Sequence, residues 1–303
     1  PMPALKTAAP AKKYYKMKDN VTGYLLLAPW LFGFFFMWLI PAAMSIYYSL
    51  TDYNLLSAPN FVGLKNYITA FTANKEFVNA LWFTVKFAVV SVVTINVLGF
   101  AMASLLTRGI RGTNLFRTVL FMPNLIGGIV LGWIWQMIFN GILYHYEMTL
   151  TFNASFGFWG LVILMNWQMI GYMMIIYIAG IQSIPTELYD AAAVDGANGW
   201  QRLTNVTLPM CMPSITICTF LTLTNSFKLF DQNMVLNEGR PYIFQNGVQI
   251  KTTEMLALNI YNTFYLNANS RGMGQAKAVL FFILVAAIAL IQLRATHSRE
   301  VQQ

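Results

Sequence analysis

Long stretches without charge constrain the fold of this sequence more than any other feature. No charged residue lies between Asn20 and Thr51, and a bilayer core about 30 Å thick needs about 20 apolar residues in a helix. Of the 303 residues, 57% are hydrophobic and 10% are charged, whereas soluble domains contain about 25% charged residues. The sequence therefore predicts an all-α integral membrane protein. Because the first apolar stretch exceeds the about 7–15 residues of a signal-peptide core, we expect it to remain as an anchor.

Six apolar stretches are predicted to be transmembrane helices. Pro29 and Pro41 should bend the first of them, which membrane helices tolerate. Two polar segments, residues 52–76 and 231–271, are predicted to be external loops because they follow the first and the fifth span. The six spans cover about residues 20–51, 77–107, 118–139, 158–181, 213–230 and 272–294.

Basic residues are distributed unevenly over the two sides of this predicted topology. Six spans place both termini on one side, and short cytoplasmic loops are enriched in lysine and arginine. We therefore expect both termini in the cytoplasm, with residues 1–19 as a basic cytoplasmic tail and residues 20–303 as the transmembrane domain. The net charge of +8 is then a topology signal, and no nucleic-acid partner is predicted because the basic residues do not cluster with aromatic residues. The side with both termini contains Lys6, Lys12, Lys13, Lys16, Lys18, Arg108, Arg111, Arg117, Arg202, Arg294 and Arg299.

A polar segment between the fourth and fifth spans, residues 184–213, is predicted to form a helix–turn–helix hairpin. Pro185 suits the first turn of a helix, where its missing N–H has no partner to lose. Gly196 follows an aspartate and is typical of a helix stop. A second short helix is expected to begin near Asn198 and to end before Pro209.

The same segment contains a motif with defined spacing. An acidic residue and two alanines are followed, after fixed intervals, by a glycine, a hydrophobic residue and a Leu-Pro pair. This pattern resembles the EAA loop of binding-protein-dependent ABC importer permeases, and its surroundings are similar to the carbohydrate-uptake branch related to maltose permease. This sequence departs from the family pattern in having aspartate at position 190, where the family usually has glutamate. The matching residues are Asp190-Ala191-Ala192, Gly196, Val206 and Leu208-Pro209.

The resemblance covers nearly the whole chain after the tail and implies both a fold and an assembly. The implied fold is the type I ABC importer permease, with a cytoplasmic hairpin that couples to ATPase subunits. The implied function is the import of a carbohydrate, an oligosaccharide, across a bacterial cytoplasmic membrane. The implied partners are a second homologous permease, two ABC ATPase subunits, an extracytoplasmic sugar-binding protein and membrane lipid. The resemblance assigns ATPase coupling to Glu187, Asp190, Ala191, Ala192, Asp195, Gly196 and Pro209.

Two predicted spans contain stripes that are candidates for a substrate pathway. Residues spaced i, i+3, i+4 and i+7 lie on one face of a helix, and polar side chains at membrane depth avoid lipid. In maltose-type permeases the sugar contacts fall on these two helices, whereas hydrogen bonding between helices is the alternative explanation of the polar residues. The candidate positions are Trp167, Gly171 and Met174 on span four and Thr222, Asn225, Ser226 and Leu229 on span five.

Three lysines, Lys86, Lys228 and Lys277, lie inside predicted spans. A charge within the membrane is costly, so each should face a partner, a cavity or the interface. Asp231 lies three residues after Lys228, a spacing that allows a charge pair on one helix face. Contact between Lys228 and substrate is the alternative.

The sequence contains no recognisable catalytic or metal site. The two cysteines, Cys211 and Cys218, would lie about 10 Å apart on one helix, too far for a disulfide. No G-x-x-x-x-G-K-[ST] phosphate loop is present, so we expect no cofactor in this chain, no enzymatic activity of its own, and ATP and Mg²⁺ on the partner ATPases. The alternative function is a self-contained secondary transporter, but such proteins often use acidic relays in the membrane, and the charged residues inside these spans are lysines.

Overall fold

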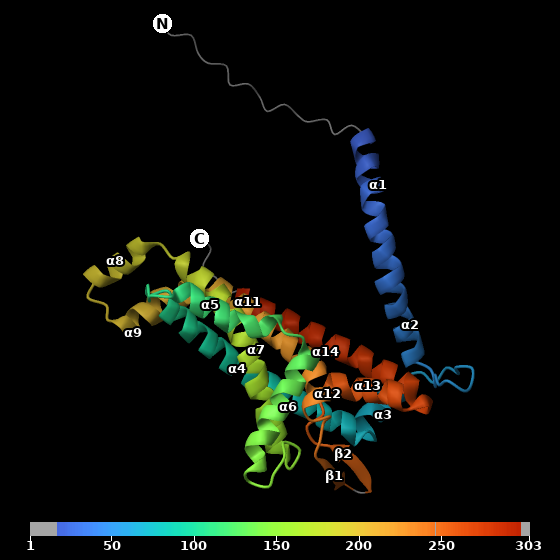
Figure 1. Cartoon of the computed structure of the whole chain (residues 1–303). Coiled ribbons are helices and arrows are strands. Elements are labelled where there is room, and N and C mark those ends of the chain that lie inside the picture. Colours follow the sequence, from blue (N-terminus) through green and yellow to red (C-terminus); the bar gives the residue numbers. More distant parts are fainter. Residues whose placement is uncertain (1–16, 246, 298–303) are drawn as a thin grey trace. The chain divides into compact units, whose positions relative to one another are not determined.

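The computed structural model describes residues 17–245 and 247–297, so most of the predicted basic tail and Arg299 lie outside the described residues. The chain divides into two compact units, residues 1–47 and 48–303. Helices dominate both units (Figure 1).

The first predicted span is one continuous helical run that includes a wider, π-helical turn. It consists of α1 (Met17–Phe34), the π-helical turn η1 (Phe35–Leu39) and α2 (Ile40–Ser49). Pro29 lies inside α1, and the π turn ends just before Pro41, with the Ile40 N–H donating to the Phe35 carbonyl. A π turn shifts the hydrogen-bond register by one residue, so the helix continues through a proline that has no N–H to donate.

The second unit contains the remaining helices and one small sheet. Its sheet has two antiparallel strands, in which Tyr242 pairs with Lys251 and Gln245 with Val248. The elements, in order, are α3 (Lys65–Thr72), α4 (Lys75–Leu106), α5 (Thr113–Phe121), η2 (Met122–Leu125), α6 (Gly128–Tyr144), α7 (Ala154–Gln182), α8 (Thr186–Val194), α9 (Gly199–Arg202), η3 (Leu203–Thr207), α10 (Leu208–Met210), α11 (Met212–Lys228), α12 (Asp231–Leu236), β1 (Tyr242–Gln245), β2 (Val248–Lys251), α13 (Leu256–Tyr261), η4 (Asn262–Leu266), η5 (Ala268–Ser270) and α14 (Arg271–His297).

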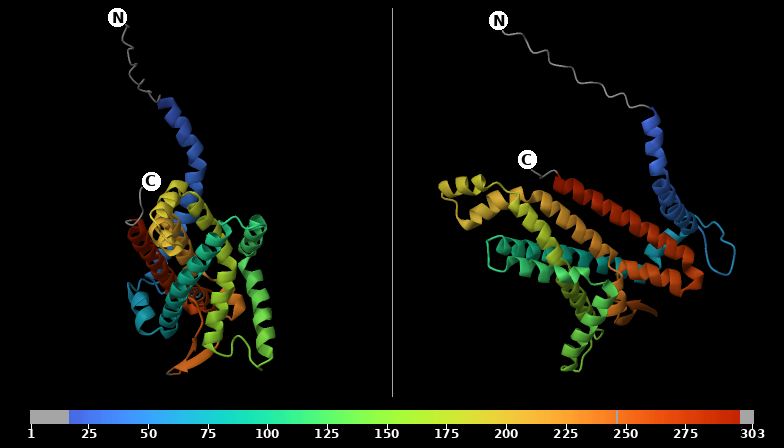
Figure 2. Two further views of the ribbon diagram at one scale, coloured as in Figure 1. Left: turned by 90° about the vertical axis from the view of Figure 1, so that its left-hand side faces the viewer. Right: turned by 45° about the horizontal axis from the view of Figure 1, so that its top comes forward.

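The core of the second unit is built around α7, which packs against α4 and α11 (Figures 1 and 2). The helices approach closely at Gly99, where a Cβ would lie 3.2 Å from the Met173 Cβ. Because α7 is covered on several sides, its buried residues do not follow one narrow stripe. The largest fully buried side chains of this cluster are Phe87, Ile95, Leu161, Leu164, Met165, Met173, Met174, Tyr177 and Leu236.

Four uninterrupted helices in the described residues are long and apolar enough to cross a membrane. Two further pairs of helices meet the same criteria only when each bent pair is counted as one span, which gives up to six. The four uninterrupted spans are Gly23–Ser49, Lys75–Leu106, Ala154–Gln182 and Ala268–Ala295.

The predicted third span, about residues 118–139, is not one straight helix, because α5 with η2 and α6 meet at an angle of 102°. The chain becomes extended at Ile126, whose ψ is 131°. Beyond the bend, α6 lies against α12 through its glycines: a Cβ on Gly128 would lie 3.0 Å from the Asp231 Cβ, and one on Gly132 would lie 2.9 Å from the Val235 Cβ. The bend therefore places the face of α6 that contains Gly128 and Gly132 against α12, although the two helices are far apart in the sequence.

The prediction that residues 231–271 form a loop is also wrong, since α12, β1, β2 and α13 all lie within them. Asn233 organises this region: its Nδ2 donates to the Thr253 carbonyl, and its Oδ1 accepts from the Met255 N–H, each at 2.9 Å. Buried backbone groups require such partners. Polar side chains of this segment therefore hydrogen-bond the buried backbone, and not all of them are exposed to solvent.

The lysines inside the predicted spans have different surroundings. Lys86 is exposed on α4. Lys277 on α14 is fully buried, and its Nζ donates to Asn259 Oδ1 at 2.9 Å and to Thr263 Oγ1 at 2.8 Å. The partner that a buried charge requires is therefore supplied to Lys277 by α13 and η4.

Candidate functional site

The hairpin predicted over residues 184–213 is present and lies at one end of the second unit (Figure 2). Its first helix, α8, ends in a Schellman motif: the Gly196 N–H donates to Ala193, and the Ala197 N–H donates to Ala192 at 2.9 Å. This motif places the residue at C′ in the left-handed region, and Gly196 has φ +73°. The prediction that Gly196 ends the first helix is confirmed.

The second helix of the hairpin begins with a capping box. The Gln201 N–H donates to Asn198 Oδ1 at 2.9 Å, and the Asn198 N–H donates to Gln201 Oε1 at 2.8 Å. These two bonds satisfy amides that the helix leaves unpaired at its start, as predicted for a helix beginning near Asn198.

The prediction that this helix ends before Pro209 is wrong. The π turn η3 shifts the register, with the Leu208 N–H donating to the Leu203 carbonyl, and α10 continues through Pro209 to Met210. The chain bends only at Cys211, where the preceding helices and α11 meet at 71°. Pro185 lies at the N-cap of α8, immediately before its first turn.

The outward surface of the hairpin contains acidic and apolar side chains together. Glu187, Asp190 and Asp195 are exposed, with Ala191 beside them. The hairpin also exposes two large apolar side chains that the motif does not include, Val194 at 88% and Trp200 at 72%. Large apolar side chains that are this exposed mark interaction surfaces when they lie together. The feature of the sequence that could have indicated these two residues is their position on either side of the turn.

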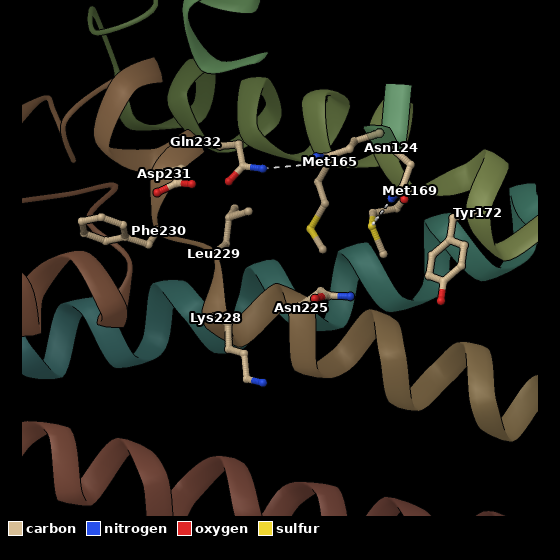
Figure 3. A pocket seen from close by; sticks show the side chains of 11 residues that line it. Asn124, Met165, Met169, Tyr172, Asn225, Lys228, Leu229, Phe230, Asp231 and Gln232 are labelled. Carbon is tan, nitrogen blue, oxygen red and sulfur yellow. Dashed lines mark hydrogen bonds between the residues drawn. The ribbon is translucent and has the colours of Figure 1, made fainter. Parts of the chain in front are cut away.

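A second candidate site, here called the central cavity, is a cavity of about 510 Å³ where α11 ends. Figure 3 shows the side chains of α7, α11, α12 and η2 directed around it. Gln232 Nε2 donates to Gln168 Oε1 at 3.0 Å across its edge. The lining residues are Asn124, Met165, Gln168, Met169, Tyr172, Asn225, Lys228, Leu229, Phe230, Asp231 and Gln232.

The face of α7 that lines this cavity differs from the predicted one. Gly171 is in contact with the Leu120 carbonyl, which a Cβ would overlap, and Met174 is fully buried. Trp167 packs edge-to-face on Trp135 at 5.6 Å. Trp167 and Gly171 line a separate cavity of about 330 Å³ instead. The stripe that faces the 510 Å³ cavity, with the same spacing, is Met165, Gln168, Met169 and Tyr172.

The predicted polar stripe on α11 is divided between the cavity and the helix packing. Asn225 lines the cavity. Thr222 and Ser226 are fully buried, and their hydroxyls donate to the carbonyls of Cys218 and Thr222, each at 2.7 Å. Hydroxyls bonded to their own helix need no other partner, which explains how α11 buries them.

The predicted ion pair between Lys228 and Asp231 is not formed in the described part of the chain. Helix α11 ends at Lys228, and Leu229 is extended with ψ 113°, so the i, i+3 relation of a helix is lost. Leu229 itself falls outside the helix for the same reason, although it lines the cavity. Figure 3 shows the two charged side chains pointing in different directions.

The second unit combines apolar spans with a capped hairpin at one end and a cavity that is lined in part by polar side chains. These features together are those of a membrane transport permease. The chain belongs to the family of binding-protein-dependent transport system inner membrane components, whose family model matches residues 95–297. The resemblance inferred from the hairpin motif is thereby confirmed.

Similar proteins match over almost the whole chain. A probable starch degradation products transport system permease protein, AmyD of Thermoanaerobacterium thermosulfurigenes, is 45% identical over 96% of this chain and 99% of its own. The trehalose/maltose transport system permease protein MalF of Thermococcus litoralis is 28% identical over 94% and 96%. A bacterial ABC transporter that imports the acidic polysaccharide alginate has a similar fold, with a TM-score of 0.74 at 19% identity over 93% and 97%. At this low identity, the similarity supports the fold alone.

Proposed function

We propose that this chain is a membrane subunit of an ABC importer for oligosaccharides released from starch. The observation behind this proposal is the 45% identity to a probable starch degradation products permease over almost the full length of both chains. The proposed assembly contains a second homologous permease, two ATPase subunits that bind ATP and Mg²⁺, and an extracytoplasmic sugar-binding protein.

The hairpin is the proposed docking element for an ATPase subunit. Helix α8 begins four residues after α7 ends, and α10 is joined to α11 through Cys211 alone. A displacement of the hairpin therefore acts directly on α7 and α11, the helices that line the central cavity. This connection supports a mechanism in which ATPase closure tilts the two helices and exposes the cavity alternately to the two sides.

Open space beside the hairpin would allow such a movement. A cavity of about 660 Å³ lies where α8 and α9 meet the ends of α4 and α7. Tyr189 and Thr207 join the two halves of the hairpin through their hydroxyls at 3.1 Å. The hairpin is therefore braced internally while the space beneath it is open, as expected of an element that moves as one body.

The central cavity is the proposed binding site for sugar. Asn225, Gln168 and Tyr172 provide amides and a hydroxyl, and Met165 and Met169 provide apolar surface. Sugar sites need directed hydrogen-bonding groups together with apolar surface. In the proposed topology both termini and the hairpin are cytoplasmic, and the β1–β2 region is external.

ATP dependence tests the proposed function against the alternative of a secondary transporter. The full complex, with both permeases and both ATPases, is reconstituted in vesicles with the sugar-binding protein, and uptake of α-1,4-linked glucose oligosaccharides is measured. We expect uptake only with ATP and Mg²⁺ on the ATPase side, and this chain should co-purify with the ATPases. Uptake driven by an ion gradient without ATP would overturn the proposal.

A further inference from the structure

Phe230 lies on two neighbouring cavities of the described chain. It lines the central cavity and also a second cavity of about 450 Å³. Phe230 follows the end of α11 and precedes α12, so no helix passes between the two cavities at this residue. The two cavities are therefore neighbours that share Phe230 in their walls.

Aromatic rings continue from Phe230 along the second cavity. The ring centroids of Phe230 and Tyr261 are 5.1 Å apart, and those of Tyr261 and Tyr265 are 4.8 Å apart. Phe264 follows at 4.9 Å from Tyr265, nearly perpendicular to it. These four residues, here called the aromatic ladder, all line the second cavity.

The position of the rings follows from two local features. Tyr261 and Tyr265 are four residues apart at the end of α13 and in η4, so they lie on one helix face. Gly274 of α14 lies behind the ladder, and a Cβ there would lie 2.9 Å from the Phe264 Cβ. The absence of a side chain on Gly274 therefore allows Phe264 to pack into the wall of the cavity.

The chemistry of the ladder suits a carbohydrate. A pyranose ring has an apolar C–H face and a rim of hydroxyls, whereas tyrosine has a flat apolar ring and a hydroxyl that can hydrogen-bond. The cavity also contains Gln275, whose amide is of the type that bonds sugar hydroxyls.

We propose that the aromatic ladder is a second carbohydrate subsite, which holds the units of an oligosaccharide that extend beyond the central cavity. This inference rests on the proposed function as a sugar importer and adds selectivity for chain length to it. Monosaccharides and disaccharides fill the central cavity alone, whereas longer oligosaccharides also occupy the ladder. Loss of the ladder should therefore affect only the longer substrates.

The test compares glucose oligosaccharides of increasing length in the reconstituted complex. The variants are Tyr261→Leu and Tyr265→Leu, which remove the flat ring, and Tyr265→Phe, which retains it. The matched control is Tyr144→Leu at the end of α6, an exposed tyrosine outside the ladder. We expect both ladder variants to lower the uptake of α-1,4-linked glucose hexasaccharide about tenfold, equivalent to about 1.4 kcal/mol. Disaccharide uptake should stay within about twofold. Tyr265→Phe should lower hexasaccharide uptake less than Tyr265→Leu does, and Tyr144→Leu should transport both sugars normally.

Disaccharide uptake and sugar-stimulated ATP hydrolysis report whether each variant is folded. If Tyr261→Leu does not assemble, Tyr265→Leu alone provides the test of the subsite. Tyr265 is 61% exposed, so its replacement disturbs little packing. A second measurement uses Tyr265→Trp, whose fluorescence should change on addition of hexasaccharide and remain constant with disaccharide.

The outcomes separate this inference from the proposed function. Equal loss for all sugar lengths, or no loss for any length, would overturn the ladder subsite and leave the importer function intact; the second result is that expected of aromatic residues at a membrane interface. Failure of the unmodified complex to transport any of these sugars would overturn the proposed function and the subsite together.

Discussion

Tyr177 on α7 donates a hydrogen bond from its hydroxyl to Asn96 Oδ1 on α4, at a distance of 2.6 Å. The Asn96 amide extends this contact to Thr222 Oγ1 on α11 at 3.4 Å. Three helices of the core are thus joined by polar side chains within an otherwise apolar cluster. Since a polar group without a partner is costly in such surroundings, this network favours one packing of the helices over others.

Replacement of Tyr177 by phenylalanine should destabilise the protein without changing its fold. The ring remains, but the Asn96 oxygen loses its donor, and hydrogen bonds between membrane helices contribute about 0.6–1.7 kcal/mol. The thermal unfolding midpoint of the purified complex measures the effect, with Tyr144→Phe as the exposed control. An unchanged midpoint in Tyr177→Phe would show that the contact does not stabilise the core.

Gly171 should tolerate no side chain, because its Cα faces the Leu120 carbonyl directly. Gly171→Ala is expected to overpack the contact between α7 and the end of α5, at a cost of about 1–3 kcal/mol or more. Gly141→Ala in α6 is the matched control, since a Cβ there has nothing within 4 Å. The yield of folded protein after detergent extraction should fall for the first variant only. Equal yields would indicate that the helices move apart at little cost.

Gly196→Asp should uncouple ATP hydrolysis from transport while leaving the permease assembled. A side chain at φ +73° adds strain of about 1 kcal/mol, and the new carboxylate lies on the proposed docking surface. Gly109→Asp is a close control, because Gly109 has φ +75° and equally open space but lies outside the hairpin. Asp190→Lys should act like Gly196→Asp by reversing the surface charge.

The measurement is ATP hydrolysis by the reconstituted complex with and without sugar-loaded binding protein. Stimulation should be lost in Gly196→Asp and Asp190→Lys and retained in Gly109→Asp. Full stimulation and full uptake in both hairpin variants would rule out the hairpin as the coupling element.

Asn225 and Ser226 are neighbours in sequence that should differ in their effect on uptake. Asn225 lines the central cavity, whereas the Ser226 hydroxyl bonds within its own helix. Loss of one hydrogen bond to sugar, about 1 kcal/mol or more, should lower uptake by Asn225→Ala about fivefold or more. Ser226→Ala should stay within about twofold. Similar uptake in the two variants would argue against a sugar contact by Asn225.

The proposed orientation can be tested with an impermeant thiol reagent on intact cells. Cys211 and Cys218 are buried and are first replaced by alanine. Cysteines at Arg111 and Val194 should then be protected, and cysteines at Leu56 and Gln245 should react. All of these positions are exposed in the protein. Labelling at Val194 from outside would contradict both the orientation and the proposed role of the hairpin.

The hairpin was predictable because its signals are local. Schellman and capping-box geometry is determined within a few residues of Gly196 and Asn198, and the sequence contains those residues at the required spacing. The apolar spans were predictable for a similar reason, since the length and hydrophobicity of a segment are properties of that segment alone.

The bent third span and the cavity-facing stripe of α7 were not predictable in this way. The bend depends on Gly128 and Gly132 meeting α12, about 100 residues later in the chain. One face of α7 lies toward the cavity and another lies toward α4 and α5, yet both faces contain methionine and aromatic residues. Composition does not distinguish them, because a helix surrounded by other helices has no single apolar side.

The Schellman and capping-box hydrogen bonds of the hairpin turn join residues within the segment from Ala192 through Gln201. The turn therefore needs no template from the rest of the protein to adopt its conformation. A graft of residues 184–213 into another permease of this fold should keep its shape, and the recipient should then recognise the ATPase of the donor. Subunit pairing in these importers would in that case be exchangeable by replacing one short peptide, without redesign of the membrane helices.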